Sequence, residues 1–282
     1  MQRSPHPRVR GRALATVGLC LALVTCADEN ARPTGPSPVG ESSAGSEAAG
    51  ATEPVVLVGA GSIADCGTEH DAATAALLAG IGGTVFTTGD NVRTGSTSEF
   101  TNCYAPTWGA EKARTRPVAG EREYWTSGAA GYYGYFGSAA GEPDAGYDSF
   151  DLGAWHVVVL NSSVSMAAGS AQEQWLRQDL AAHPRQCTLG IWHYPRFSSY
   201  STYVRAAIKP VWEALYAAGA DVVVNGHYRF YERYAPQTPD GVADPERGIR
   251  QFTIGLGGQG VWICWGRRGR RTKCSSTTYT VS

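Results

Sequence analysis

Three side chains that commonly bind metals follow short apolar runs in distant parts of the sequence. Asp90 follows TVFTTG, His193 follows TLGIW and His227 follows DVVVNG. A carboxylate and two imidazoles are typical ligands of a divalent cation such as Zn²⁺. Each residue also has an ordinary structural reading, since Asp90 could cap a helix and either histidine could be a hydrogen-bonded core residue. The three together favour a metal site.

The elements that would position these residues are apolar strands alternating with helices. The predicted strands are 54–61, 84–88, 155–160, 188–192, 221–224 and 251–254, and the predicted helices are 69–79, 172–182 and 210–219. A capping pair, Ser170 and Glu173, opens the second helix. This pattern predicts an α/β fold, in which ligands bind at the carboxyl ends of the strands. The segment 132–147, where glycines and aromatic residues alternate, is expected to be a long surface excursion.

Five sequence blocks give the chain a more specific resemblance. They are GSI at 61–63, GDN at 89–91, GERE at 120–123, WHYP at 192–195 and GHYR at 226–229. Over residues 54–258 the chain resembles the calcineurin-like metallophosphoesterases, and within them the secreted bacterial relatives of purple acid phosphatases. The resemblance implies a four-layer α/β/β/α sandwich that hydrolyses phosphoric esters with two metal ions. Asp90 matches the aspartate that bridges the metals, and His193 and His227 match ligands of the second metal.

The sequence departs from the family at the first metal. Ser62 stands where the family has an aspartate ligand, and Arg229 stands where it has a histidine ligand. Arg93 stands near the position of a ligating tyrosine. Because a guanidinium repels a divalent ion and a single carboxylate holds it poorly, we expect the first metal to be absent.

The second metal site is expected to persist. Asp90, His193 and His227 are retained, and Glu121 replaces an asparagine of the family. A carboxylate binds a divalent ion at least as well as an amide does, so the sequence predicts one Zn, Mn or Fe ion. Arg122 replaces the histidine that would protonate the leaving group. Arginine is a poor proton donor but binds phosphate oxygens in a bidentate manner.

Two functions are compatible with these residues. In the first, the chain is a metal-dependent hydrolase of phosphoric monoesters or diesters, in which Arg122 is the catalytic residue and binds phosphate together with Arg229. In the second, it is a catalytically impaired relative that serves as an exported binding module for phosphate or another anionic small molecule. A structural alternative for the arginines is salt bridging to Asp90, Glu121 or Glu123.

The ends of the chain predict an exported protein. Residues 1–26 combine four arginines with an apolar run and end in LVTC, so they predict either a lipoprotein signal with lipidated Cys26 or a cleaved secretion signal. Residues 27–53 are expected to be a flexible linker. Residues 259–282 are an atypical basic tail, either native or produced by truncation or a frameshift. The net charge of −1 gives no reason to expect specific nucleic-acid binding.

The cysteines predict disulfides in an oxidising compartment. Cys66 and Cys103 are candidates for one disulfide, and Cys264 and Cys274 could form another. Cys187 would then be left as a buried thiol in an apolar strand.

Overall fold

The computed structural model describes residues 55–200, 205–260, 263–265 and 271–273. The predicted signal segment 1–26, the linker 27–53 and the pairing of Cys264 with Cys274 lie outside the residues whose side chains are described. Among the described residues, no helix is both long enough and apolar enough to cross a bilayer.

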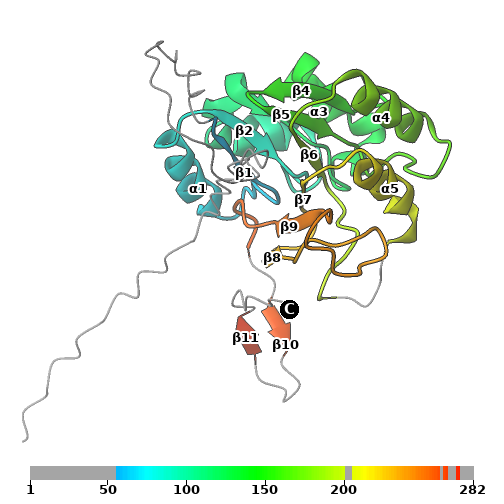
Figure 1. The fold of residues 1–282 in the computed structure, drawn as a ribbon. Coiled ribbons are helices and arrows are strands. Elements are labelled where there is room, and N and C mark those ends of the chain that lie inside the picture. Colours follow the sequence, from blue (N-terminus) through cyan, green and yellow to red (C-terminus); the bar gives the residue numbers. More distant parts are fainter. Residues whose placement is uncertain (1–54, 201–204, 261–262, 266–270, 274–282) are drawn as a thin grey trace, which may run out of the picture.

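Two sheets form the centre of the domain (Figure 1). The first is parallel, in the order β1-β2-β3, with strands Leu57–Ala60, Thr84–Thr87 and Thr115–Arg116. The second has the order β4-β5-β6-β7-β9-β8, with parallel strands at its centre and antiparallel strands at both edges. Its strands in chain order are Asp148–Leu152, Trp155–Val159, Cys187–Trp192, Val222–Asn225, Tyr231–Arg233 and Arg250–Ile254. A separate antiparallel pair, β10 with β11, joins Ile263–Trp265 to Arg271–Lys273.

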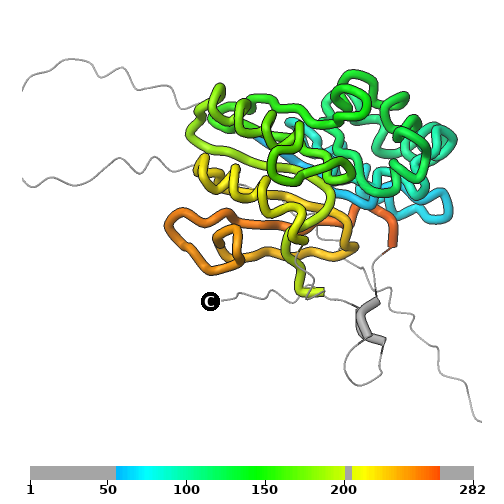
Figure 2. The backbone as a smooth tube through the Cα atoms, turned by 90° about the vertical axis from the view of Figure 1, so that its right-hand side faces the viewer, coloured from blue at the N-terminus to red at the C-terminus, as the bar shows by residue number. Residues whose placement is uncertain are grey.

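Alternating side chains pack the two sheets against each other and against outer helices. Phe86 of β2 and Val157 of β5 lie in the core between the sheets, whereas Val85 lies in a core with residues of α1 (His70–Ala79). Val158 lies in a third core with residues of α4 (Ala171–Ala182) and α5 (Lys209–Ala217). In the rotated view, α4 and α5 lie on the opposite side of the molecule from the helical segment 97–140 (Figure 2). This arrangement confirms the predicted four-layer α/β/β/α sandwich.

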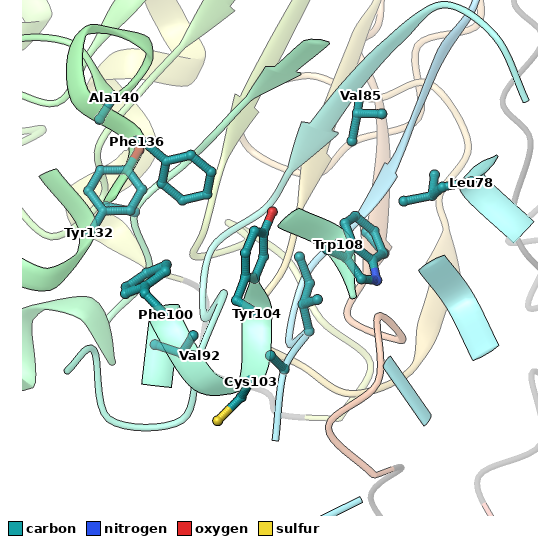
Figure 3. Packing of buried hydrophobic residues seen from close by; sticks show 14 of the residues in the cluster. Leu78, Val85, Val92, Phe100, Cys103, Tyr104, Trp108, Tyr132, Phe136 and Ala140 are labelled. Atoms are coloured by element: carbon teal, nitrogen blue, oxygen red, sulfur yellow. The ribbon is translucent and has the colours of Figure 1, made fainter. Parts of the chain in front are cut away.

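The segment 132–147 is not a simple surface excursion, so that prediction was wrong. It begins within α3 (Ala130–Phe136), and Tyr132 and Phe136 are 0% and 5% exposed. Their rings contact each other edge to face, and Phe136 also contacts Phe100 (Figure 3). The interleaved aromatic residues therefore build the outer core of the first sheet. The other short helical elements of this layer are Thr97–Glu99, Phe100–Tyr104, Trp108–Arg114, Glu123–Trp125, Ser127–Ala129 and Gly137–Ala140.

Three cysteines of the domain confirm one expectation and correct another. Cys66 and Cys103 form the predicted disulfide, with their Cα atoms 5.1 Å apart. Cys187 is also disulfide-bonded, so the prediction of a lone buried thiol was wrong.

Candidate metal centre

The loops that leave β1, β2 and β7 meet at the carboxyl ends of the strands. At each exit a residue other than glycine has a left-handed backbone, with φ of 53° at Ser62, 54° at Asp90 and 67° at His227. Such angles are uncommon for residues other than glycine, although aspartate and histidine adopt them more often than most, and they turn the chain sharply as it leaves the strand. The loops also pair with each other, because the amide of Ser62 donates to the carbonyl of Gly89 over 3.0 Å. A side chain at Gly89 would begin 2.7 Å from Nδ1 of His193, so this approach requires glycine.

His193 presents one ring nitrogen to Asp90. Its Nδ1 lies 2.7 Å from the carbonyl oxygen of Thr88 and therefore carries a proton that it donates. Its Nε2 lies 3.3 Å from Oδ1 of Asp90, yet this buried atom makes no satisfactory hydrogen bond to any described residue. Two electron-rich atoms that face each other in a dry site are well suited to hold a cation between them.

His227 and Glu121 form a second such pair. Nδ1 of His227 is buried without a hydrogen-bond partner among the described residues and lies 3.9 Å from Oε1 of Glu121. The pKa of His227 is lowered to about 2. The main cause is burial, followed by the nearby His193 and then by the positive charges of Arg205 and Arg122. The imidazole is therefore neutral, which is the form that binds metals.

Each of these two spacings suits a pair of ligands on a divalent cation. Two ligands of a tetrahedral zinc ion, each bonded at about 2.1 Å, stand about 3.4 Å apart. The separation between Asp90 and His193 matches this value, and the separation between His227 and Glu121 is slightly wider. Among the described residues, no three of Asp90, Glu121, His193 and His227 form a group of ligand atoms within 4.8 Å of one another. The structure therefore places the predicted ligands as two pairs, and their donor types suit Zn²⁺, Mn²⁺ or Fe²⁺.

Arg122 is held against Asp90. Its Nε lies 3.1 Å from Oδ2 of Asp90, and its backbone amide lies 3.2 Å from Oδ1 of the same carboxylate. Its Nη1 donates to the carbonyl of Arg93, and its guanidinium lies 5.0 Å from the ring of Trp125. Salt bridging to Asp90 was the structural alternative considered for this arginine, and the structure contains that pair.

Arg229 differs from Arg122 because it forms no ion pair with any residue in the described part of the chain. Its Nη2 donates to Oε1 of Gln259 over 3.3 Å. Burial, followed by the nearby charge of Arg122, lowers the pKa of Arg229. Arg93, by contrast, is exposed and paired with Asp65 at 2.8 Å. The charge of Arg229 is therefore available to an anion from outside.

Glu123 has a role that the sequence analysis did not assign. Its carboxylate accepts hydrogen bonds from four backbone amides, those of Asp90, Asn91, Val92 and Gly120, at 2.6–3.4 Å. The side chain is fully buried, and burial together with the charge of Asp90 raises the pKa of Glu123 to about 8. The residue fixes the loop that presents Asp90. Its place in the GERE block was the only signal for it.

Three further residues complete the surroundings, and of these only Tyr194, in the WHYP block, belongs to a sequence motif. The hydroxyl of Tyr194 donates to Oε2 of Glu121 and so holds this carboxylate beside His227. The guanidinium of Arg205 lies 3.6 Å above the ring of Tyr194. Gln259 is buried and donates to the carbonyl of Asp90 over 2.9 Å. The contacts of the domain thus continue past residue 258.

Comparison with known proteins supports the architecture. No family model matches the chain. Among curated proteins, it is 38% identical over 93 residues to purple acid phosphatase 15 of Arabidopsis thaliana, covering 31% of this chain and 18% of that protein. It is 35% identical over 121 residues to purple acid phosphatase 21 of the same plant, covering 40% of this chain and 26% of that protein. The chain therefore matches about a quarter or less of the length of these relatives.

Solved structures agree over a larger part of the chain. The purple acid phosphatase PPD1 of yellow lupin matches 78% of this chain and 46% of its own, with a TM-score of 0.59 and 14% identity. PhoD matches 72% of this chain and 57% of its own, with a TM-score of 0.54 and 13% identity. The chain therefore has a metallophosphoesterase-type fold.

Proposed function

We propose that this protein is a metal-dependent phosphoric ester hydrolase that uses one divalent metal ion and a phosphate-binding arginine. The observation that carries the proposal is the pair of buried, unpartnered imidazole nitrogens, Nε2 of His193 and Nδ1 of His227. Leaving such atoms without partners costs stability unless a ligand occupies them. Asp90 and Glu121 supply the negative charge that a cation requires.

The bound metal and the two arginines would have different roles in hydrolysis. A bound metal would polarise a phosphoryl oxygen and make water more acidic. Arg229, which has no carboxylate partner among the described residues, would bind a non-bridging phosphate oxygen. Arg122 would place a fixed positive charge on the Asp90 side, where the family has its first metal, and offer its remaining N–H groups to phosphate. In this proposal the family's first metal is absent.

The lack of a proton donor on the protein would restrict the substrates. Arg122 replaces the expected proton donor, and a guanidinium does not give up its proton at ordinary pH. The leaving oxygen would therefore depart without a proton from the protein. Phosphoric esters with acidic leaving groups, such as p-nitrophenyl esters, would be the favoured substrates.

The salt bridge between Arg122 and Asp90 supports a second candidate function. With this bridge intact, the chain could bind phosphate or another small anion through Arg229 without metal and without turnover. In that case the protein would be an exported anion-binding module.

One set of assays separates the two functions. The hydrolase should release p-nitrophenol from p-nitrophenyl phosphate or bis(p-nitrophenyl) phosphate in the presence of Zn²⁺ or Mn²⁺, and His193→Ala should abolish the release. The binding module should take up phosphate in the presence of chelator, as measured by calorimetry, and lose that affinity on Arg229→Ala. Arg93→Ala is the matched control, because it removes an exposed neighbouring arginine that already has a partner. Turnover no greater than that of His193→Ala with every metal tried would reject the hydrolase.

Export is part of the proposal. The disulfide between Cys66 and Cys103 and the bonded state of Cys187 support an oxidising compartment. We propose secretion or a lipid anchor on Cys26, as in the secreted bacterial proteins that the sequence resembles. Intact-mass measurement of the protein recovered from its native host would distinguish a cleaved chain from an acylated one.

A further inference from the structure

A second cluster of metal-binding side chains lies far along the strands from the candidate metal centre. It joins His156 near the start of β5, Asp179 in the last turn of α4 and His183 just after that helix (Figure 1). One potential ligand atom from each residue lies within 4.8 Å of the other two. Asp90 and His193 follow the opposite, carboxyl ends of the strands. This cluster is therefore separate from the site described above.

The central histidine of the cluster is buried and held from both sides. His156 is 1% exposed, its Nδ1 lies 2.9 Å from Oδ1 of Asp151, and its Nε2 lies 2.8 Å from Oδ2 of Asp179. Asp151 is the cross-strand partner of His156 on β4 and is itself paired with Arg185. A carboxylate that binds the far nitrogen of a histidine is the usual outer support of a metal ligand, because it fixes the ring and increases its basicity.

The carboxylate of the cluster has equally defined surroundings. Oδ1 of Asp179 accepts a hydrogen bond from the hydroxyl of Ser149 over 2.8 Å and lies 3.2 Å from Nδ1 of His183. Asp179 is 8% exposed. Its Oδ2, which faces His156, is thus the oxygen that is oriented for a cation.

His183 provides the open side. Its side chain is 47% exposed, and its ring stacks on that of His156 with the centroids 4.9 Å apart and 16° between the planes. Its Nδ1 lies 2.9 Å from the backbone carbonyl oxygen of Asp179, so the ring is held beside the cluster while its other edge faces solvent. The site is then accessible from outside.

We propose that His156, Asp179 and His183 form a structural binding site for a zinc-class divalent cation. Nε2 of His156, Oδ2 of Asp179 and one nitrogen of His183 would be the protein ligands, and water would complete a tetrahedron. The proton shared by Nε2 of His156 and Asp179 would pass to solvent on binding, so affinity would fall at acidic pH. The ion would tie the end of α4 to the edge pair β4 and β5, and it would act on stability rather than on phosphate chemistry.

The test measures zinc in the full-length protein with the candidate metal centre disabled. In a His193→Ala, His227→Ala background, elemental analysis after equilibration with Zn²⁺ should give one zinc per chain, and added His183→Ala should abolish it. His70→Ala is the matched control, because His70 is an exposed histidine at the first position of another helix and should leave the zinc content unchanged. Zinc at 100 times its Kd should also raise the Tm of the background by about 5 °C or more, and the His183→Ala form should not respond.

Two results would overturn the site. One is zinc content below 0.2 per chain in the folded background variant, and the other is equal zinc content with and without His183. If the background variant does not fold, the same comparison in the otherwise unchanged chain decides the question. There His183→Ala should lower the zinc content by one per chain, and an unchanged content rejects the proposal.

Discussion

Nε of Arg122 lies 3.1 Å from Oδ2 of Asp90, so a side chain of the protein neutralises the carboxylate at the centre of the candidate site. The two side chains are only 16% and 3% exposed, which makes this a largely desolvated ion pair. A guanidinium in this position offers fixed positive charge without an exchangeable ion. In the proposed function, this guanidinium provides positive charge on the side of Asp90 where the family has its first metal.

Removing this partner should destabilise the metal-free protein. Arg122→Ala leaves the buried charge of Asp90 uncompensated, and we expect the free energy of unfolding to fall by about 3 kcal/mol in chelator. Added Zn²⁺ or Mn²⁺ should then stabilise the variant more than the unchanged protein, because Asp90 is free for a cation. Denaturant titrations with and without metal measure both effects. Arg93→Ala, which breaks an exposed pair, should cost less than about 1 kcal/mol, and equal losses for the two variants would contradict the argument.

Restoring the first metal should require three changes. Ser62→Asp and Arg229→His introduce the residue types that the family uses as ligands, but Arg122 would still form its salt bridge with Asp90. We therefore expect Ser62→Asp, Arg122→His and Arg229→His together to add one metal ion per chain. The double variant that retains Arg122 is the control and should bind less metal. Elemental analysis of both variants checks the difference, and equal metal content would show that Arg122 does not exclude the ion.

The proposed hydrolase should depend strongly on its leaving group. A protein general acid contributes about 10²- to 10⁴-fold, and Arg122 cannot act as one. The quantity to compare is the ratio of kcat/KM for p-nitrophenyl phosphate to kcat/KM for an alkyl phosphate. We expect this ratio to be at least about 100-fold larger in this protein than in a family member that has the histidine. Arg122→His should reduce this ratio by increasing turnover of the alkyl ester. A ratio that Arg122→His leaves unchanged would argue against the assignment.

Acid should destabilise the metal-free protein through His227. Its pKa is about 2 in the folded chain against an ordinary value of 6.5, so between these values the unfolded chain binds more protons. Stability from this residue is complete above pH 6.5 and decreases as pH falls, by at most about 1.4 kcal/mol per pH unit. His227→Asn removes the titrating group and should flatten the curve between pH 6 and 4, because other groups contribute equally to both proteins. If the free energy of unfolding falls with pH equally in the unchanged protein and in His227→Asn, both in chelator, His227 is not the source of the acid sensitivity.

Glu123 should be far more sensitive to substitution than Glu121. Glu123→Ala removes the acceptor of four buried backbone amides, and we expect a loss of about 3 kcal/mol or more in the free energy of unfolding. Glu121→Ala alters a partly exposed carboxylate and should change stability by less than about 1 kcal/mol while reducing metal affinity. Chemical unfolding and metal titration of both variants separate the two roles. Similar stability losses would mean that Glu123 is not the main support of the Asp90 loop.

Much of the fold could be predicted because its central strands are continuously apolar and end in polar residues. The predicted strands at 155–160, 188–192 and 221–224 correspond to β5, β6 and β7, and the pair Ser170 and Glu173 caps α4 as expected. The two-residue strand β3 and the mostly polar edge strand β4 carry no comparable pattern. The segment 132–147 was misread because its glycines suggested a loop, although its aromatic residues fill a core.

The placement of Asp90, His193 and His227 at the carboxyl ends of the strands could be predicted because each residue follows a strand, and the strands are parallel. The contacts of Arg122, Glu123 and Gln259 could not, because they depend on how separate loops meet. Gln259 lies 169 residues from Asp90 in the sequence, and no local sequence pattern predicts a contact over that separation. The metal-like spacing of Asp90 and His193 likewise exists only in three dimensions.

The left-handed residues Ser62, Asp90 and His227 have a consequence for laboratory evolution of this protein. Each holds a conformation that costs a residue other than glycine about 1 kcal/mol, with asparagine and aspartate penalised least. A library selected only for heat resistance should therefore gain glycine or asparagine at positions 62 and 227. A variant changed at position 227 would be more stable but would lack a predicted metal ligand, so selection would have to act on stability and on metal binding together.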